Sequence, residues 1–276
     1  MERGLRSVLE IRCELRQFNM DTKRRKTLEY KLRISAQARA LVESWKPDVV
    51  IIADDNAAKY VIAPFFKDHA IPLVFSGVNW TAREYGFPYA NVTGMVEIAP
   101  IQPVLSRVAE LVGSDKGAFY LGADTLTERK NIKRFVTGAK ELGIKLDHGL
   151  VATLADWKQA LLKAQNYSFV IMASNSGIND WDHDVAMRIT SEYSKQLSTT
   201  NHGWMMPYTM FGMTKIPEEQ GEWSAQAALA IISGTSPAES LIMANRKWDL
   251  WINQGLLRTV GMRLPGKLRA KAKHFK

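Results

Sequence analysis

Short, continuous apolar runs alternate with amphipathic segments along most of this 276-residue chain. Residues 49–53 and 169–173 contain no polar side chain, as expected of strands that are covered on both faces of a parallel sheet. Segments with helical spacing of their apolar residues follow such runs. Because parallel neighbours must be joined by long crossovers, this alternation predicts an α/β protein with doubly wound parallel sheets.

The same pattern predicts the individual elements. Strands are expected at residues 11–18, 49–53, 72–75, 117–121, 144–151, 169–173 and 248–252. Helices are expected at residues 25–45, 55–66, 98–111, 125–142, 155–164, 182–196 and 217–232. Residues 125–128 have the form of a capping box. In the first helix we expect one side to face the core, formed by Leu28, Leu32, Ala36, Ala40 and Leu41.

The series of strands and helices restarts near Glu97, and the chain is too long for one ordinary core. We therefore expect two α/β lobes. The first should contain residues 1–96 and 206–235, and the second residues 97–205 and 236–276. No Gly/Ser-rich linker separates them, so several short crossings should join them.

Composition and charge exclude several classes of protein. Apolar residues make up 46% and charged residues 24%, as in soluble globular proteins. No apolar stretch is long enough to span a membrane, and we expect no secretory signal in this chain. The single cysteine, Cys13, excludes an internal disulfide framework and is expected at a half-buried strand position.

The net charge is +9, with basic runs at residues 23–26 and in the last ten residues. Such a surface could steer anions, nucleic acid or anionic lipid. Aromatic residues do not interleave with these runs as a single-strand binder requires, so we expect no nucleic-acid partner.

Polar residues follow four of the expected strands, where each strand ends. In open parallel sheets, ligands bind beyond these carboxyl ends. Each polar residue could cap the next helix, reach a ligand, or do both. Three tryptophans in polar loops could either pack in the core or stack on a ligand. The candidate ligand-binding residues are Asp54, Asp55, Asn56, Gly77, Asn79, Trp80, Asp124, Thr125, Asn175, Trp181 and Trp204.

Metal and enzyme chemistry have little support. Asp54 and Asp55 could accept hydrogen bonds from an ammonium group or hold a hard cation, but no further oxygen ligands converge by spacing. The five histidines show no zinc-binding pattern. The chain has no nucleophile elbow, phosphate-binding loop or dinucleotide fingerprint. We expect no catalytic residue, no resident metal and no cofactor.

Several segments, each weak alone, are fairly specific in combination. They are residues 20–24, 45–60, 72–80, 91–95, 120–125, 218–223, 234–238 and 257–265. Together they resemble the ABC-transporter substrate-binding proteins of the tryptophan/tyrosine-type group, which have the type I periplasmic binding fold.

The resemblance implies a monomeric periplasmic or lipid-anchored protein. Such a protein holds a small solute, an amino acid or a related compound, in the cleft between two lobes and delivers it to a membrane permease. By position, the family's ligand contacts fall on Asp55, Asn56, Asn79, Trp80, Asp124, Thr125, Asn175 and the Trp204 region.

Two departures from the family stand out. Where relatives have Gly-Thr or Ser-Thr, this chain has Asp54, Asp55 and Asn56, which weakens the inference of an amino-acid ligand. Relatives also begin with an additional strand and helix, so the first lobe is expected to lack its N-terminal strand. Residues 1–10 would then be the end of that helix.

Two other functions stay open. One is a ligand-sensing regulatory module of the same fold, which a linked kinase or DNA-binding domain would favour. The other is an enzyme on the two-lobed scaffold, which turnover of a bound ligand would favour and the missing nucleophile and base disfavour.

Overall fold

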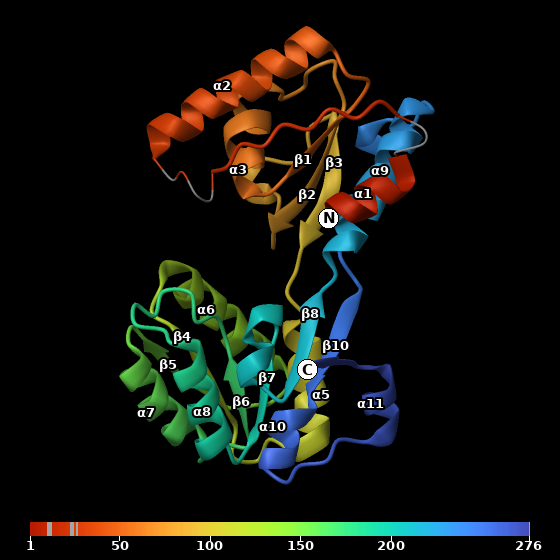
Figure 1. The fold of residues 1–276 in the computed structure, drawn as a ribbon. Coiled ribbons are helices and arrows are strands. Elements are labelled where there is room, and N and C mark those ends of the chain that lie inside the picture. Colours follow the sequence, from red (N-terminus) through yellow and green to blue (C-terminus); the bar gives the residue numbers. More distant parts are fainter. Residues whose placement is uncertain (10–12, 23–24, 26, 276) are drawn as a thin grey trace. The chain divides into compact units, whose positions relative to one another are not determined.

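The chain folds into two compact units, each with its own sheet and core. The computed structural model describes residues 1–9, 13–22, 25 and 27–275. Unit 1 comprises Met1–Ile98 and Ile216–Lys247, and unit 2 comprises Ala99–Lys215 and Trp248–Lys276 (Figure 1). Residues 206–215 and 236–247 thus lie in the unit opposite to the predicted one. The reason is strand pairing, because β8 (Phe211–Lys215) joins the sheet of unit 2 and β9 (Met243–Ala244) joins that of unit 1.

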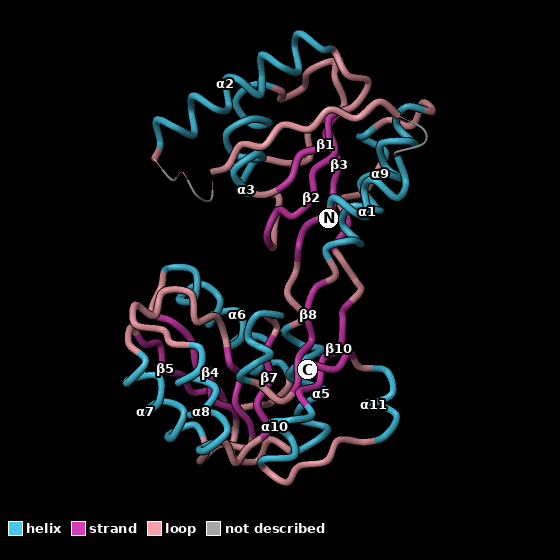
Figure 2. Tube along the Cα trace, in the orientation of Figure 1, coloured by secondary structure: helices cyan, strands magenta, loops and turns pink. Residues whose placement is uncertain are grey.

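The sheet of unit 1 is fully parallel. Its order is β1 (Val50–Ala53), β2 (Leu73–Asn79), β3 (Val92–Glu97) and β9. Residues 13–18 form no strand, and Ile11 and Arg12 lie outside the described residues. Cys13 is half-buried and lies at a bend rather than in a strand. Figure 2 draws no strand between α1 and α2 among the described residues. Among the described strands β1 therefore pairs only with β2 and forms one edge of the sheet.

Helices lie on both sides of this sheet. Figure 1 shows α2 (Leu28–Trp45) and α3 (Asp55–Ala57) on one side, and α1 (Glu2–Leu9) and α9 (Pro217–Ile232) on the other. The predicted helix 55–66 is continuous but changes form, from α3 through a π-helical turn, Ala58–Ile62, to α4 (Ala63–Phe65). Short 3-10 turns occupy Arg83–Tyr85 and Pro237–Glu239.

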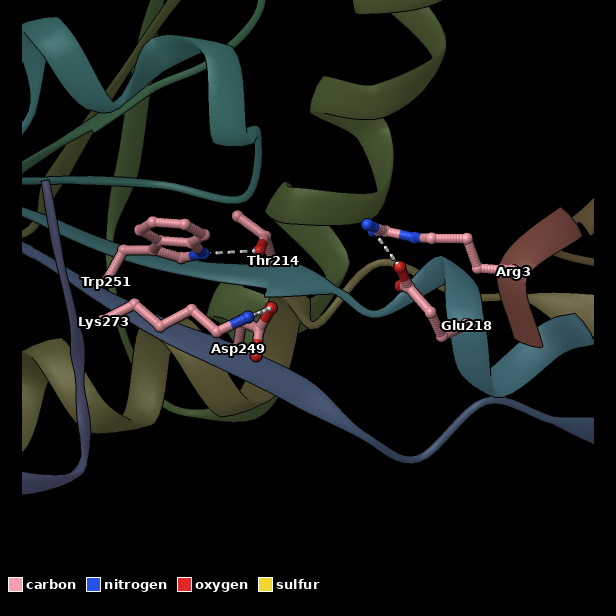
Figure 3. Close-up of polar contacts among 6 residues, drawn as sticks. All are labelled: Arg3, Thr214, Glu218, Asp249, Trp251 and Lys273. Atoms are coloured by element: carbon pink, nitrogen blue, oxygen red, sulfur yellow. Dashed lines mark hydrogen bonds and ion pairs between the residues drawn. The ribbon is translucent and has the colours of Figure 1, made fainter. Parts of the chain in front are cut away.

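Helices α1 and α9 touch through their backbones. A Cβ added at Gly221 would lie 2.0 Å from the carbonyl oxygen of Met1, and one added at Gly4 would lie 2.2 Å from that of Glu218. Arg3 forms an ion pair with Glu218 across the same contact (Figure 3). Glycine is thus required at both positions for the helices to approach this closely.

The predicted core face of α2 is wrong. Leu28 is 60% exposed and Leu32 55% exposed, and Ala36 and Ala40 are also exposed. The helix instead turns Ser35, Ala38 and Val42 inward. The buried Ser35 hydroxyl donates to the carbonyl of Lys31 at 2.7 Å, so its burial leaves no donor unsatisfied.

The sheet of unit 2 has seven strands in the order β11-β10-β8-β7-β6-β4-β5. The strands β4 (Ala118–Ala123), β6 (Phe169–Met172) and β7 (Leu197–Thr200) run parallel with β8, and β5 (Leu146–Val151) continues the parallel part at one edge. The strand β10 (Trp248–Asn253) runs antiparallel to β8 and parallel to β11 (Lys273–Phe275), so this sheet is mixed rather than purely parallel. Thr214 accepts a hydrogen bond from Trp251, and Lys273 donates to Asp249, across these three strands (Figure 3).

Alternate residues of β4 pack on opposite faces of this sheet, as a pleated strand requires. Phe119 and Leu121 share a core with α7 (Leu154–Ala164) and α8 (His183–Tyr193), centred on the buried Trp157. On the other face Tyr120 packs on Phe135 of α6 (Leu126–Glu141). The remaining helices are α5 (Ile101–Val112), a 3-10 helix at Gly203–Tyr208, α10 (Gln254–Thr259) and α11 (Gly266–Lys271). No helix within the described residues is both long and apolar enough to cross a membrane.

Candidate functional site

The carboxyl ends of β1 and β2 in unit 1 meet around the carboxylate of Asp55. Its Oδ1 accepts a hydrogen bond from the Tyr85 hydroxyl at 2.7 Å. Its Oδ2 accepts from the side-chain amide of Asn79 at 2.5 Å, and the Asn79 backbone N–H also points at this carboxylate, 3.2 Å from Oδ1. Burial raises the pKa of the Tyr85 hydroxyl most, and its hydrogen bond to Asp55 raises it further. The hydroxyl therefore stays protonated and remains a donor at physiological pH.

Two residues of this edge have strained backbones. Asp54 has φ 83° and Trp80 has φ 65°, in a region that side chains other than glycine rarely adopt. Such conformations cost about 1–3 kcal/mol each and cluster at functional sites. Asp54 also caps α3, since its Oδ1 accepts from the backbone N–H of Asn56, whose side chain donates to Thr22. The capping role that the sequence left open is therefore real for Asp54.

The backbone of Gly77 is bound by α9, which lies on the other side of the sheet from α3 (Figure 1). It has φ 65° and lies at a register shift of β2, and its N–H donates to Oε1 of Gln220 at 3.1 Å. Gln220, on α9, is 3% exposed and also reaches the carbonyl of Val96. No sequence pattern indicates this role of Gln220, because only the fold brings α9 to β2. Tyr85 was likewise not among the predicted residues.

The polar loops of unit 2 also come together at the carboxyl edge. The backbone N–H of Ala123 donates to the carbonyl of Ser174, and a Cβ added at Gly177 would lie 2.4 Å from the methyl group of Thr125. The loops that carry Thr125 and Asn175 are therefore adjacent. The N–H of Asp124 donates to the carbonyl of Val151, which adds the end of β5 to the same edge.

Asp124 and Thr125 have partners within unit 2. Arg129 donates two hydrogen bonds to the carboxylate of Asp124, at 2.7 and 2.8 Å, and these bonds lower the pKa of Asp124. Thr125 caps α6 by accepting from the N–H of Glu128. Thr125 thus performs the capping role that the sequence allowed, whereas exposed Asp124 caps no helix and is paired with Arg129 instead.

The two predicted tryptophans of unit 2 differ in burial, and a ligand contact stays a prediction for Trp204. Trp181 packs edge-to-face on Trp157, with ring centres 5.0 Å apart, and donates to the hydroxyl of Tyr208, so it extends the core. Trp204 is 56% exposed and stacks on His202, with ring centres 4.4 Å apart. Burial and the charge of Lys215 lower the pKa of His202 to about 4, which keeps the stacked imidazole neutral.

Two further polar residues of unit 2, Glu128 and Asn201, are buried, which was not predicted. Glu128, 2% exposed, turns into the core below the edge, where its carboxylate accepts hydrogen bonds from the Tyr120 hydroxyl and from Asn131. Only half of the expected capping box is thus present. Asn201, which follows β7, is 8% exposed, and its Oδ1 has no hydrogen-bond partner in the described structure.

The predicted residues line neither of the two hollows described below and form no metal centre within the described structure. In the described parts of the chain no three His, Cys, Asp or Glu side chains are grouped so that they could hold a metal ion. A hollow of about 360 Å³ in unit 1 is lined by His69, Pro72 and Asn91, at the amino ends of β2 and β3, and so lies at the opposite edge of the sheet. A hollow of about 430 Å³ in unit 2 lies beside Glu110 and Arg263.

Comparison with known proteins identifies the fold. No protein-family model matches the chain, and no curated protein matches it in sequence. Among solved structures, a ligand-free, open substrate-binding protein with adhesive properties from Clostridium difficile is similar, with TM-score 0.76 and 14% identity over 100% of this chain and 93% of that one. An ABC domain in complex with L-Trp from Streptococcus pneumonia has TM-score 0.59 and 14% identity over 88% and 83% of the two chains. A LacI transcriptional regulator from Lactobacillus brevis has TM-score 0.59 and 13% identity over 88% and 91%.

The chain therefore has the α/β fold of the type I periplasmic-binding-protein kind, as the sequence predicted. This fold is shared by substrate-binding proteins and LacI-type regulators. At these sequence identities the similarity establishes the fold only. It does not distinguish a substrate-binding protein from a regulator.

Proposed function

We propose that the chain binds a small molecule through the carboxyl-edge loops of its two units and does not transform it. The proposal rests on one observation, made separately in each unit. The polar loops that the sequence singled out gather at the carboxyl edge of a parallel sheet, around Asp55 and Asn79 in unit 1 and around Thr125 and Asn175 in unit 2. This is the edge at which open parallel sheets bind ligands.

The chemistry of the two edges fits a polar solute with an apolar part. In unit 1 the carboxylates of Asp54 and Asp55 suit a ligand with a hydrogen-bond donor, such as an amine, and half-buried Trp80 offers an aromatic surface. In unit 2 exposed Trp204 offers a second such surface. An amino acid or a related compound has both features, in keeping with the resemblance noted from the sequence.

We further propose that this binding serves ABC-type uptake. The chain would act as a monomer in the periplasm or anchored to lipid, and would deliver its solute to a membrane permease. Similarity in fold to substrate-binding proteins supports this role. A ligand-sensing regulatory module is the alternative, and similarity to LacI-type regulators favours it equally.

A thermal-shift screen against amino acids, nucleosides, small organic acids and oligopeptides tests the binding proposal. A ligand should raise the melting temperature of the protein. Asn79→Ala and Trp80→Ala should each abolish that rise without unfolding the chain, because Asn79 is exposed and Trp80 only half-buried. Asn166→Ala, an exposed amide between α7 and the amino end of β6, and so at the other edge of the sheet, is the matched control and should respond like the wild type. Unchanged responses in both edge variants would remove the loop of unit 1 from the site.

A deletion experiment in cells distinguishes the uptake role from the regulatory role. If the protein serves uptake, deleting it should abolish high-affinity accumulation of the ligand found in the screen. If it is a regulator, uptake should persist while the transcriptional response to the ligand is lost.

A further inference from the structure

The hollow of about 430 Å³ in unit 2 lies at the amino edge of its sheet. It is lined by the end of α5, by the first residue of β7 and by the loop that joins α10 to α11. Its volume is within the range of about 300–1,000 Å³ that small-molecule sites occupy. The loops that carry Thr125 and Asn175 follow the carboxyl ends of their strands, so the hollow lies at the opposite edge from them.

Apolar side chains form most of the lining of this hollow. They are Leu111, Val112, Leu197, Met262, Leu264 and Pro265. Leu197 and Leu264 are buried, whereas Val112 is 37% exposed. An alkyl chain that lies in the hollow removes such apolar surface from water, and each CH₂ group that it buries strengthens binding by up to about fourfold.

The two charged residues of the lining differ in their partners. The carboxylate of Glu110 accepts a hydrogen bond from Arg107 on the same helix, at 2.8 Å, so its charge is compensated. Arg263 is exposed and forms no ion pair among the described residues. Residues 254–275 contain six lysines and arginines, Arg263 included, and no acid. The electrostatic potential around the hollow therefore favours an anion.

From this combination we infer that the hollow binds a small monocarboxylate with a short alkyl chain. The chain lies against the leucines, and the carboxylate accepts hydrogen bonds from the guanidinium group of Arg263, whose N–H groups match its geometry. An alkyl amine brings a like charge to Arg263, and an alkyl alcohol gains only the apolar contact, so both bind more weakly. This inference does not depend on the proposed ligand or on the choice between uptake and regulation.

NMR titrations of the nitrogen-15-labelled full chain with hexanoate, hexylamine and hexan-1-ol test the inference. The three probes share one alkyl chain and differ in the charge of the head group. At neutral pH we expect hexanoate to bind most tightly and to shift the backbone amide signals of Val112, Leu197 and Arg263, while those of Asn79 and Asn175 stay in place. Along the series butanoate, hexanoate and octanoate the affinity should rise with each CH₂ group, by up to about fourfold.

Variants at the rim of the hollow separate charge from apolar contact. Arg263→Gln should weaken hexanoate binding about twofold to fivefold, as expected for an exposed charge, while Arg258→Gln, exposed on α10 outside the hollow, is the matched control. Arg263→Glu should reverse the order, so that hexylamine binds more tightly than hexanoate. Val112→Trp should fill the hollow and abolish binding, whereas Leu142→Trp, at a similarly exposed position outside it, should not.

Several results would overturn the inference. One is that hexylamine binds the wild type as tightly as hexanoate. Another is that Arg263→Gln changes binding no more than Arg258→Gln does, because the overall charge of the chain would then suffice. The inference also fails if Val112→Trp, with the melting temperature of the wild type, still binds hexanoate, or if the hexanoate-induced shifts arise at the carboxyl-edge loops. The last result would move the carboxylate to the site of the proposed function, which the thermal-shift screen tests separately.

Discussion

The protonation of His202 should make the free energy of unfolding of unit 2 depend on pH. Burial and the charge of Lys215 lower its pKa from 6.5 to about 4 in the folded chain. A base with a depressed folded pKa contributes stability above its unfolded pKa, and this contribution is lost as the pH falls toward the folded value. Between about pH 7 and pH 4 we expect the free energy of unfolding to fall by about 2 kcal/mol on this account, after allowance for the partial exposure of the ring.

The measurement is urea denaturation across that pH range. His202→Gln should lose this part of the pH dependence, while His148→Gln, at an exposed position on β5, should keep it. Identical pH profiles for His202→Gln and the wild type would contradict the prediction.

Glu128 should act in the opposite direction. Burial raises its pKa above 4.5, although hydrogen bonds from Tyr120 and Asn131 partly oppose the rise. An acid with a raised folded pKa contributes its stability below the unfolded pKa and loses it as the pH rises through the folded one. Glu128→Gln, which is neutral at every pH, should therefore match the wild type near about pH 4 and become the more stable of the two toward about pH 8. Chemical denaturation at both pH values checks this, and a difference that does not change with pH would show that the carboxyl is not responsible.

Single residues also show how far the site could be predicted. The polar positions after the strands were found because capping residues and ligand contacts share residue types. Gln220 and Tyr85 were not found, because they reach the edge from other elements and only the fold brings them there. The positive φ angles of Asp54 and Trp80 could not be predicted either, because the sequence signal for such a conformation is a glycine and neither residue is one.

At the scale of elements, the contact between α1 and α9 depends on glycine. Ala would favour the interior of α9 by about 1 kcal/mol through helix propensity. Its Cβ at position 221 would nevertheless lie 2.0 Å from the Met1 carbonyl, so α1 must shift, and overpacking of this kind costs about 1–3 kcal/mol. Gly221→Ala should therefore lower the melting temperature and expose α1 to proteolysis. Gly266→Ala, where an added Cβ meets nothing within 4 Å, is the control and should be neutral or slightly stabilising.

The elements themselves were predictable where the pattern was strong. The buried strand β6 is a continuous apolar run, and β2 begins with one, so both were expected, although β2 continues four residues beyond the predicted end at 75. The face of α2 was misjudged because its apolar residues are spread around the helix, so spacing alone could not choose between the leucines and the inner residues Ala38 and Val42. The antiparallel direction of β10 follows from the chain leaving unit 2 after β8 and returning, and no local signal encodes it.

At the scale of the whole molecule, the chain crosses between its units three times. The crossings follow Ile98, Lys215 and Lys247. In unit 1 buried Asn245 accepts from the N–H of Ile98 at 2.7 Å, and Glu219 accepts from the N–H groups of Arg246 and Lys247, both at 2.9 Å. The segments that lead into two of the crossings are therefore held firmly within unit 1. Short crossings were expected from the absence of a linker, but their positions depend on which sheet β8 and β9 join, which strand pairing decides.

These anchored crossings lead to a prediction that rests on the proposed function. If one ligand binds the edges of both units, it stabilises arrangements in which the two edges lie close together, in proportion to its preference for them. Saturating ligand should then reduce the radius of gyration measured by small-angle X-ray scattering. Asn79→Ala should show no such change, because it removes the partner of Asp55 at one edge, while Asn166→Ala should behave like the wild type. A ligand that raises the melting temperature and leaves the scattering profile unchanged would restrict the site to a single unit.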